Sequence, residues 1–273
     1  MYLAIDIGGT KTFVALVDEK GAIQQRLRFP TSKNYSDFIS KLADTVAYLS
    51  TNNFIAIGVG APGRIDRKRG LGVGMGNLPW ENVPLYADIS KIGRTTKVVL
   101  ENDAKLAGLS EAILVKNAYS KVLYVTIGTG IGTALIYNQE IVGVMQDAEG
   151  GKILLEHQGK LQEWEDFASG KAIKKLFGKS ASEITDEKIW QEIAHNIAVG
   201  LLDQIAIFQP EVVIIGGGVG AYLEKFKEPL EKELKSYEIP LIPIPKIVEA
   251  KQAEDAVIYG CYELAKQVYG KTD

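Results

Sequence analysis

The sequence predicts a mixed α/β protein built from two similar lobes. Two glycine-rich turns carry this prediction, because each joins two apolar, strand-like runs: one follows YLAIDI and the other follows KVLYVTI. At an offset of 120 residues, IDIGGTKTFVALVD lies over VTIGTGIGTALIYN, which places Gly8 over Gly128. The pattern indicates a duplicated unit, although two unrelated hairpins would also produce it.

In the first half, three strands are expected within the first thirty residues, joined by the turns GGTK and EKG. A helix with Ser36 as its N-cap is expected to run to about Ser50, because apolar residues recur there at helical spacing. Residues 55–63 and 97–103 are compact apolar runs closed by turn residues, as in buried parallel strands. A helix is expected to follow the second run.

In the second half, the strands KVLYVTI and TALIYN flank the turn GTGIG, and a long helix is expected from about Asp186. The strand EVVII and the turn GGGVG follow. A last helix, with Asp255 as its N-cap, is expected to pack back on the first lobe. We therefore place the first lobe at residues 1–106, with residues 255–273 packed back on it, and the second lobe at residues 107–254.

Length and composition match an ordinary globular enzyme. The chain has 273 residues, of which 46% are hydrophobic and 24% are charged, enough for a core in one or two domains. Its net charge of −3 provides no general attraction for nucleic acid, so we expect no such partner. The basic cluster Arg64, Arg67, Lys68 and Arg69 is interpreted as a solvated hairpin face, with an anion-contacting edge as the alternative.

Cys261 is the only cysteine, so we expect no internal disulfide, no thiolate zinc cluster and a cytoplasmic location. No apolar run approaches the ~20 residues that a membrane span needs. The start MYLAIDIGGT has no signal-peptide features. We therefore expect neither secretion nor a membrane partner.

The turns GGTKT and GTGIG are suited to binding phosphate, because glycine lets backbone N–H groups approach an anion and the hydroxyl and ammonium groups add donors. Taken singly, each could equally be a tight turn. Asp6 ends a buried-looking strand just before the first turn, which indicates a Mg²⁺ contact, direct or through water. The alternative is a carboxylate bound by the N–H groups of the turn.

Asn102 and Asp103 close an apolar strand, at the edge where functional side chains of open α/β sheets gather. Asn can bind sugar hydroxyls and Asp can accept a proton, but a helix cap would explain both residues equally well. The Walker motif GxxxxGK[ST] is missing from the sequence. Gly216, Gly218 and Ala221 match the dinucleotide fingerprint; we interpret this segment as a seat for adenine and ribose, with NAD(P) as the alternative.

Eight segments in order resemble the ROK family of sugar kinases: DIGGTKT, GAPGRID, GNLPWENVPL, ENDA, GTGIGTALIYN, AEGGK, WEDFASG and IIGGGVG. The resemblance implies an actin-like ATPase (ribonuclease H-like) fold, with two lobes around a central cleft, and a homodimer. It also implies a kinase that uses ATP and Mg²⁺ to phosphorylate a hexose. Glucose, giving glucose 6-phosphate, is the first expectation, followed by mannose, fructose, N-acetylglucosamine and N-acetylmannosamine.

Carried over position by position, the resemblance makes Asp103 the catalytic base. It assigns the sugar side to Asn77, Asn102, Glu149, Lys152 and Glu165. It assigns the nucleotide side to Asp6, Gly9, Thr10, Lys11, Thr129, Gly130, Gly217 and Gly218, with Asp6 also serving Mg²⁺.

Two segments depart from the family pattern. Many members have G-E-x-G-H followed by zinc-binding cysteines, whereas this chain has AEGGK, with Lys152 in place of His and no cysteine following. GNLPW is one residue shorter than the usual N-L-P-G-W. We therefore expect no zinc, interpret His157 and His195 as ordinary surface or packing residues, and leave the identity of the hexose open.

Non-catalytic and unrelated functions remain as alternatives. The family also contains sugar-responsive transcriptional repressors, which carry an additional N-terminal DNA-binding segment. Here the first candidate phosphate turn follows residue 6, so we expect an enzyme. An ATPase of the same fold acting on another substrate, and an oxidoreductase that uses GGGVGA, are the remaining alternatives.

Overall fold

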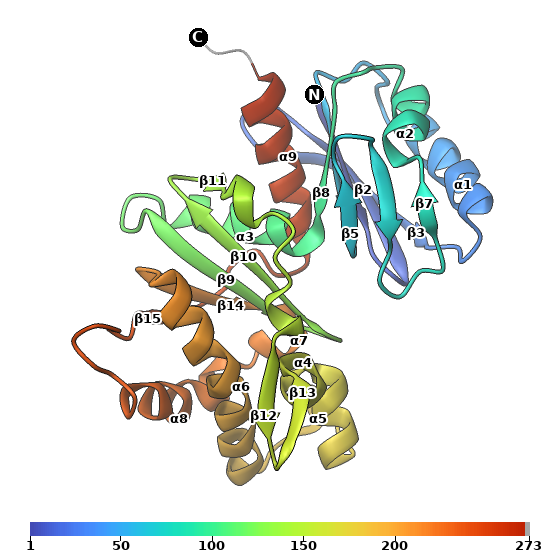
Figure 1. Ribbon diagram of the computed structural model, residues 1–273. Coiled ribbons are helices and arrows are strands. Elements are labelled where there is room, and N and C mark those ends of the chain that lie inside the picture. The colour runs from blue at the N-terminus through green and yellow to red at the C-terminus, as the bar shows by residue number, and fades with distance from the viewer. Residues whose placement is uncertain (271–273) are drawn as a thin grey trace. The chain divides into compact units, whose positions relative to one another are not determined.

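The computed structural model describes residues 1–270, in which the chain forms two units that each contain a five-stranded sheet (Figure 1). Unit 1 comprises Met1–Ser110 and the described part of Glu254–Asp273, and unit 2 comprises Glu111–Ala253. Each unit has its own apolar core.

The sheet of unit 1 has the strand order β3-β2-β1-β4-β8. Its strands are β1 (Tyr2–Ile7), β2 (Lys11–Val17), β3 (Ile23–Pro30), β4 (Ile57–Ala61) and β8 (Val98–Asn102). The first three are antiparallel neighbours, whereas β4 and β8 run parallel to β1. The predicted hairpin start and the two buried parallel strands are confirmed.

Side chains of β1 alternate between two cores because successive residues of a strand point to opposite faces. Leu3, Ile5 and Ile7 belong to the core that also holds residues of α1 (Tyr35–Ala47) and α2 (Leu85–Gly93). Tyr2 and Ala4 belong to the core formed with α9 (Ala256–Tyr269). Asp6 follows the same alternation, which places it on the α9 face of the sheet.

Helix α9 approaches the sheet closely because the strand beneath it carries glycine. A Cβ atom at Gly58 would lie 2.0 Å from the carbonyl oxygen of Cys261, and one at Gly60 would lie 2.5 Å from a methyl group of Val257. The Cys261 thiol contacts the Ile5 carbonyl at 3.5 Å. Helix α9 thus packs on the sheet of unit 1.

Helix α1 begins two residues earlier than the sequence predicts. Its N-cap is Asn34, whose Oδ1 accepts a hydrogen bond from the Asp37 N–H at 3.1 Å, so the prediction of Ser36 as the cap is wrong. Ser36 instead donates its hydroxyl to the same Asn34 oxygen at 2.8 Å. Asn is among the strongest N-cap residues, and its side chain takes the role here.

The sequence analysis expected a hairpin at the basic cluster, but not the small antiparallel sheet of unit 1 to which this hairpin belongs. The sheet contains β5 (Arg64–Asp66), β6 (Leu71–Gly74) and β7 (Glu81–Val83), in the order β5-β6-β7. The basic cluster lies on the β5–β6 hairpin. The loop with Asn77 connects β6 and β7.

The sheet of unit 2 has the strand order β11-β10-β9-β14-β15. Its strands are β9 (Lys121–Ile127), β10 (Ile131–Tyr137), β11 (Glu140–Ile141), β14 (Val212–Gly216) and β15 (Lys246–Glu249). β9 is antiparallel to β10 and parallel to β14, as β1 is antiparallel to β2 and parallel to β4. The two sheets thus share one topology, which confirms the predicted duplication.

Helices and a further hairpin complete unit 2. The long helix α6 (Glu187–Phe208) begins after the N-cap Asp186, as predicted, and packs against α8 (Leu223–Lys235). The remaining elements are β12 (Leu154–His157), β13 (Lys160–Glu163), α4 (Trp164–Ala168), α5 (Gly170–Phe177), α7 (Gly217–Gly220) and the short 3₁₀ turns Gly143–Met145, Gly150–Lys152 and Ala181–Glu183. Helix α3 (Asp103–Leu114) and the 3₁₀ turn Ala253–Asp255 lie where the chain passes from one unit to the other.

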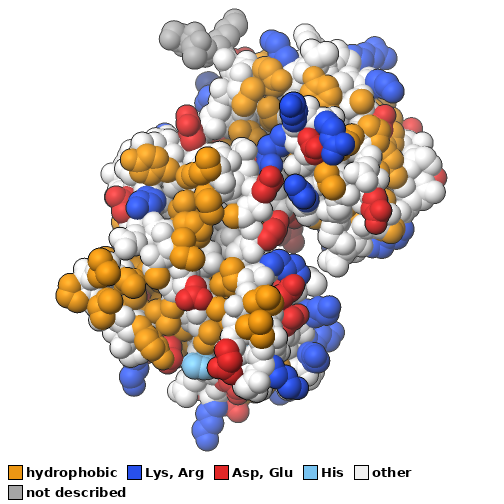
Figure 2. Space-filling model, in the orientation of Figure 1, with side chains coloured by type: hydrophobic (Ala, Val, Ile, Leu, Met, Phe, Trp, Pro, Cys, Tyr) orange, Lys and Arg blue, Asp and Glu red, His pale blue; other side chains and the backbone are white. Residues whose placement is uncertain are grey.

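Charged side chains of both signs occur on the face of the protein that Figure 2 draws. Figure 2 shows Lys and Arg side chains lying among Asp and Glu side chains on the face drawn. None of the helices within residues 1–270 is both long and apolar enough to cross a membrane.

Candidate functional site

The first glycine-rich turn, between β1 and β2, presents unused backbone donors. Gly8 N–H donates to the Lys11 carbonyl at 3.0 Å and closes the turn. The N–H groups of Gly9 and Thr10 have no hydrogen-bond partner within the described residues. The turn is held from below by Thr31, whose hydroxyl donates to the Gly8 carbonyl at 2.8 Å. These donors and the exposed Lys11 side chain can bind an anion such as phosphate.

Asp6 lies directly below this turn and is not bound by it. None of the turn N–H groups in the described chain donates to its carboxylate, so the alternative of a carboxylate satisfied by the turn is wrong. Burial, and secondly the negative charge of Asp103, raise the pKa of Asp6 to about 7. A cation beside Asp6 would offset both effects. The residue therefore fits Mg²⁺, which needs only one or two carboxylates when phosphates and water complete its shell.

Asp103 begins α3 immediately after β8, at the same sheet edge as the end of β1. β1, β4 and β8 are parallel, and Asp6, Gly60 and Glu101 occupy one row of the pairing register. The carboxyl ends of these strands therefore bring Asp6 and Asp103 close enough for the charge of one to affect the pKa of the other. Two acidic side chains at this edge can serve a cation and a proton transfer.

Asn102 acts as a helix cap, as one interpretation of the sequence proposed. Its Oδ1 accepts a hydrogen bond from the Lys105 N–H at 3.2 Å, and its Nδ2 donates to the Gly63 carbonyl at 3.0 Å. Asp103 Oδ1 accepts the N–H of Ala104 at 2.8 Å. Asn102 retains a second Nδ2 hydrogen, so a sugar contact remains chemically open to it.

Glu101 and Arg67 are residues of this edge that the sequence analysis missed. Arg67 Nε donates to Glu101 Oε2 at 2.8 Å, and Arg67 Nη2 bonds Glu101 Oε1. The Glu101 side chain is 1% exposed and that of Arg67 is 24% exposed, so the interpretation of Arg67 as part of a solvated face is wrong. A carboxylate in a buried strand needs an opposite charge beside it. The position of Glu101 in an apolar strand could therefore have indicated a basic partner.

Asn77 lies beside the first glycine-rich turn. A Cβ atom at Gly9 would lie 3.4 Å from the Asn77 Cβ. Lys33 Nζ donates to the Asn77 carbonyl at 2.8 Å, and Trp80 Nε1 donates to the Lys33 carbonyl at 2.9 Å. These bonds fix the β6–β7 loop next to the first glycine-rich turn. The amide side chain of Asn77 can therefore contact a ligand bound at that turn.

The second glycine-rich turn, between β9 and β10 in unit 2, repeats the arrangement of the first. Gly128 N–H donates to the Gly130 carbonyl at 2.9 Å, and the N–H groups of Thr129 and Gly130 have no partner within the described residues. The Gly128 carbonyl in turn accepts the Gly170 N–H at 2.7 Å. The turn at this position therefore has the same chemical capacity to bind an anion.

Glu165 and Lys152 join one another beneath the second turn. Glu165 Oε2 accepts the Ile131 N–H at 3.2 Å, and its Oε1 accepts a hydrogen bond from Lys152 Nζ at 2.6 Å. Lys152 also donates to Glu163 Oε2 at 2.8 Å. These two bonds, first to Glu163 and then to Glu165, raise the pKa of Lys152. Glu149 is exposed at the start of the turn Gly150–Lys152.

Gly217 and Gly218 begin α7 just after β14. Gly217 has φ +83°, and a Cβ atom there would lie 2.6 Å from the Ile127 carbonyl, so glycine is needed for both conformation and space. Gly218 faces open space, because nothing lies within 4 Å of a Cβ atom built on it. The segment thus lies against the end of β9, which leads into the second turn.

The histidines and the cysteine of the chain form no metal cluster. His157 stacks on Phe167 at 4.1 Å between ring centroids, and His195 lies 3.2 Å from a Glu233 oxygen. Burial raises the pKa of the Cys261 thiol well above its ordinary value. Within residues 1–270, no three His, Cys, Asp or Glu side chains are grouped as metal ligands would be.

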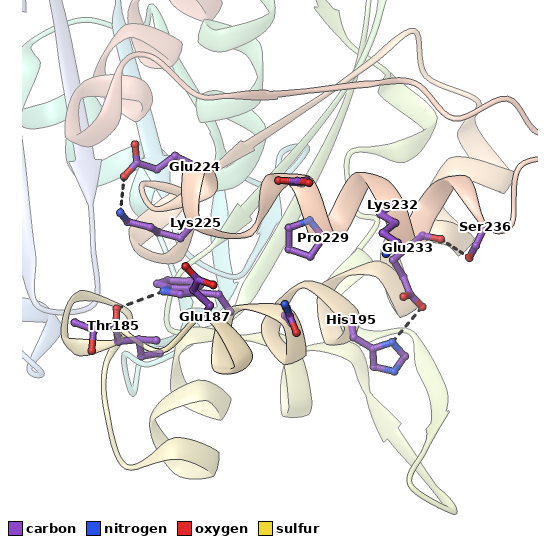
Figure 3. A pocket seen from close by; sticks show the side chains of 13 residues that line it. Thr185, Glu187, His195, Glu224, Lys225, Pro229, Lys232, Glu233 and Ser236 are labelled. Carbon is purple, nitrogen blue, oxygen red and sulfur yellow. Dashed lines mark hydrogen bonds and ion pairs between the residues drawn. The ribbon is translucent and has the colours of Figure 1, made fainter.

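A cavity of about 900 Å³ lies in unit 2 between α6 and α8. Figure 3 shows Glu224 and Lys225 near one end of α8 and Glu233 and Ser236 near the other, with His195 of α6 bonded to Glu233. None of the residues predicted for a site lines this cavity.

Comparison with known proteins identifies related chains over nearly the full length. A sequence model of the ROK family matches residues 2–268. A glucokinase of Thermotoga maritima is 28% identical and aligns over 98% of this chain and 98% of its own. An N-acetyl-D-glucosamine kinase of Haemophilus influenzae is 27% identical over 97% of this chain and 99% of its own.

A solved structure provides the comparison of folds. It is a ROK family glucokinase from Streptomyces griseus in complex with glucose and AMPPNP, 26% identical, with a TM-score of 0.79 over 97% of this chain and 99% of its own. The expectation of a two-domain, actin-like ATPase fold is confirmed.

Proposed function

This chain belongs to the ROK family and is a sugar kinase, and on that premise we propose that it transfers the γ-phosphoryl group of ATP to a hexose, glucose first. The observation that carries the proposal is the pair of glycine-rich turns, each with two unused backbone N–H groups, together with Asp103 at the sheet edge of the first. Phosphoryl transfer depends mainly on positioning and charge neutralisation, and these groups supply both.

In the proposed reaction, Asp103 accepts the proton of the hexose hydroxyl, most simply the primary 6-OH. The hydroxyl oxygen forms a bond to the γ-phosphorus while the bond from that phosphorus to the bridging oxygen of ADP breaks, and its electron pair leaves with ADP. The proton remains on the Asp103 carboxyl until solvent removes it. Mg²⁺, held at Asp6, would neutralise phosphate charge when bound.

We assign the nucleotide to donors from both turns. Gly9, Thr10 and Lys11 of unit 1 and Thr129 and Gly130 of unit 2 would contact the phosphates. Gly217 and Gly218 would lie along the adenosine. The support for this assignment is the unused N–H groups and the open space at Gly218.

We assign the hexose to Asn77, Asn102, Glu149, Lys152 and Glu165. Glucose is preferred because curated relatives and a solved neighbour are glucokinases. N-acetylglucosamine is the second candidate, because an N-acetyl-D-glucosamine kinase matches over nearly the same length. Lys152, with one of its three N–H donors left after the bonds to Glu163 and Glu165, would help to distinguish them.

The test is a coupled ADP-release assay with Mg-ATP and a panel of hexoses and amino sugars, applied to the parent chain and to Asp103→Asn. The parent is expected to release ADP only when a sugar is present. Asp103→Asn is expected to lower kcat by about 100-fold or more, because a general base contributes about 10²–10⁴-fold.

Asp44→Asn, on the exposed surface of α1, is the matched control and is expected to leave kcat unchanged. A parent chain that releases no ADP with any sugar would overturn the proposed reaction. An Asp103→Asn variant that retains turnover within a few-fold of the parent would overturn the assignment of the base.

A further inference from the structure

Arg67 lies at the sheet edge of Asp103 and makes a bidentate ion pair there. Its Nε and Nη2 atoms bond the two oxygens of Glu101, and its Nη1 donates to the Ile65 carbonyl at 3.4 Å. The Glu101 side chain is 1% exposed. A planar guanidinium matches a carboxylate in this geometry, whereas an ammonium offers only a point charge. The pair therefore fixes both the charge and the orientation of Glu101.

Glu101 passes this orientation to the next residues of the chain. Its Oε1 accepts the N–H of Asn102 at 2.7 Å. Asn102 in turn caps α3 through the Lys105 N–H at 3.2 Å and holds the Gly63 carbonyl at 3.0 Å. Asp103 is the first residue of that helix. A continuous set of bonds thus runs from Arg67 to the backbone that carries the Asp103 carboxylate.

Removal of Arg67 would leave Glu101 as a buried, unpaired carboxylate. Such a group either takes up a proton or moves toward water, since an isolated charge in an apolar interior is strongly disfavoured. Either response changes the acceptor that holds the Asn102 N–H. The backbone that carries Asp103 would then lose one of the bonds that fix its position.

We propose that Arg67 is a positioning residue for phosphoryl transfer, which acts through Glu101 to hold Asn102 and Asp103 in the productive arrangement. The proposal rests on the proposed function, because Asp103 is the base only in a kinase. Arg69 of the same hairpin pairs instead with Asp66, the last residue of β5.

The experiment compares Arg67→Met, Arg67→Lys, Glu101→Gln and the double variant Arg67→Met/Glu101→Gln, with Arg69→Met as the matched control. For each folded variant, kcat and the KM values for hexose and ATP are measured, together with the melting temperature. Hydrogen exchange of peptides that cover residues 98–108 is measured in parallel, because this readout does not depend on turnover.

Arg67→Met is expected to lower kcat about 10- to 100-fold, in line with the cost of a misplaced catalytic group, with the ATP KM within about twofold. Arg67→Lys is expected to recover only part of this loss, because an ammonium group keeps the charge but cannot bind both carboxylate oxygens as the planar guanidinium does. Exchange in residues 98–108 is expected to rise in Arg67→Met and to stay at the parent level in Arg69→Met.

The double variant separates positioning from stability. It has no buried unpaired charge, so its melting temperature is expected to return toward that of the parent while kcat stays low. Recovery of kcat together with stability would show that the pair acts only on stability and would overturn the proposal. So would unchanged exchange in Arg67→Met.

Failure of the proposed function and failure of the inference about Arg67 give different results. If the parent chain phosphorylates no hexose, the reaction assignment is lost, whereas the exchange measurement still decides whether Arg67 holds the β8–α3 junction. An active parent whose Arg67→Met variant retains full kcat would reject the inference and leave the kinase assignment intact.

Discussion

At the scale of single residues, Asp6 is a carboxylate whose burial costs stability in the ligand-free protein. Its pKa of about 7, against a usual value of 3.8, means that the folded chain keeps a proton that the unfolded chain releases between those pH values. The free energy of unfolding therefore falls as the pH rises from about 4 to about 7. Above this range the full penalty of the charge remains.

Asp6→Asn is accordingly expected to stabilise the protein at pH 8, by an amount on the order of 2 kcal/mol after allowance for partial exposure. The gain is expected to shrink as the pH falls toward 4. Urea unfolding at several pH values in the presence of EDTA measures it, with Asp44→Asn as the exposed control. Equal gains at pH 4 and pH 8 would contradict the assigned pKa.

Lys152 holds two carboxylates beside the second glycine-rich turn, and we expect its removal to weaken the binding of the nucleotide as well as that of the hexose to which we assign it. Lys152→Met would leave the charge of Glu165 uncompensated while its Oε2 still bonds the Ile131 N–H. Because the side chain of Lys152 is 50% exposed, the pair is worth up to about 1 kcal/mol, and the ATP KM is expected to rise by up to about fivefold.

Steady-state kinetics with varied ATP and varied hexose separates this effect from one on the sugar. Lys160→Met, on the strand β13 that also carries Glu163, provides the control and is expected to leave the ATP KM unchanged. A change confined to the hexose KM would indicate that Lys152 serves the sugar alone.

The positions of Asp6 and Asp103 could be predicted, because each lies near the end of an apolar strand and strand ends are recognisable in the sequence. Asp6 is the last residue but one of β1, and Asp103 directly follows β8. Their roles stay predictions. The ion pairs of Arg67 and Lys152 could not be predicted, because the partners Glu101 and Glu163 are 34 and 11 residues away in the sequence. The basic cluster looked exposed in the sequence, but one of its arginines, Arg67, pairs with the buried carboxylate of Glu101.

At the scale of elements, the close contact between α9 and the sheet of unit 1 depends on glycine residues in β4. Gly58 lies in β4 under Cys261, with space for no more than hydrogen. Gly58→Ala is expected to lower the free energy of unfolding by about 1–3 kcal/mol, because the helix must move away from the sheet.

Gly74→Ala is the matched control, since nothing lies within 4 Å of a Cβ atom at that exposed position of β6. Its effect is expected to stay within about 0.5 kcal/mol. Thermal and urea unfolding of both variants decides the matter. Equal stability of Gly58→Ala and the parent would contradict the close packing.

Helices and strands could be predicted where the hydrophobic pattern was clear and the segment was long enough to show it. The strands β1, β2, β4, β8, β9 and β14 are apolar runs bounded by glycine or turn residues, and α6 is long enough to show its period. The sheet β5-β6-β7 and the hairpin β12–β13 were missed, because strands of three or four residues show too few alternations to be recognised. Asn34 was missed as a cap because Ser36, two residues later, is also a good capping residue.

At the scale of the whole molecule, the two units differ in how their cores are assembled. The core of unit 2 draws only on residues between Leu123 and Ile247. The α9 face of unit 1 combines Tyr2 and Ala4 with Ile258, Cys261 and Tyr262 from the far end of the chain. Unit 2 is therefore complete within one continuous segment, and unit 1 is not.

We expect the isolated segment 111–253 to fold and the segment 1–110 to remain unfolded. In the first, sheet and helices are all present; in the second, the face of β1 and β4 that α9 covers would be exposed to water. Circular dichroism melting of both segments measures this. A cooperative transition for residues 1–110 alone would contradict the dependence on α9.

The late position of α9 also determines when each unit can be finished during translation. The ribosome makes β1 before unit 2 and α9 after it, so unit 1 must wait, with one face of its sheet uncovered, while all of unit 2 is synthesised. Unit 2 can close its core before α9 is made, whereas unit 1 can close only afterwards. The half-built sheet is thus the part of the nascent protein that most needs protection from aggregation.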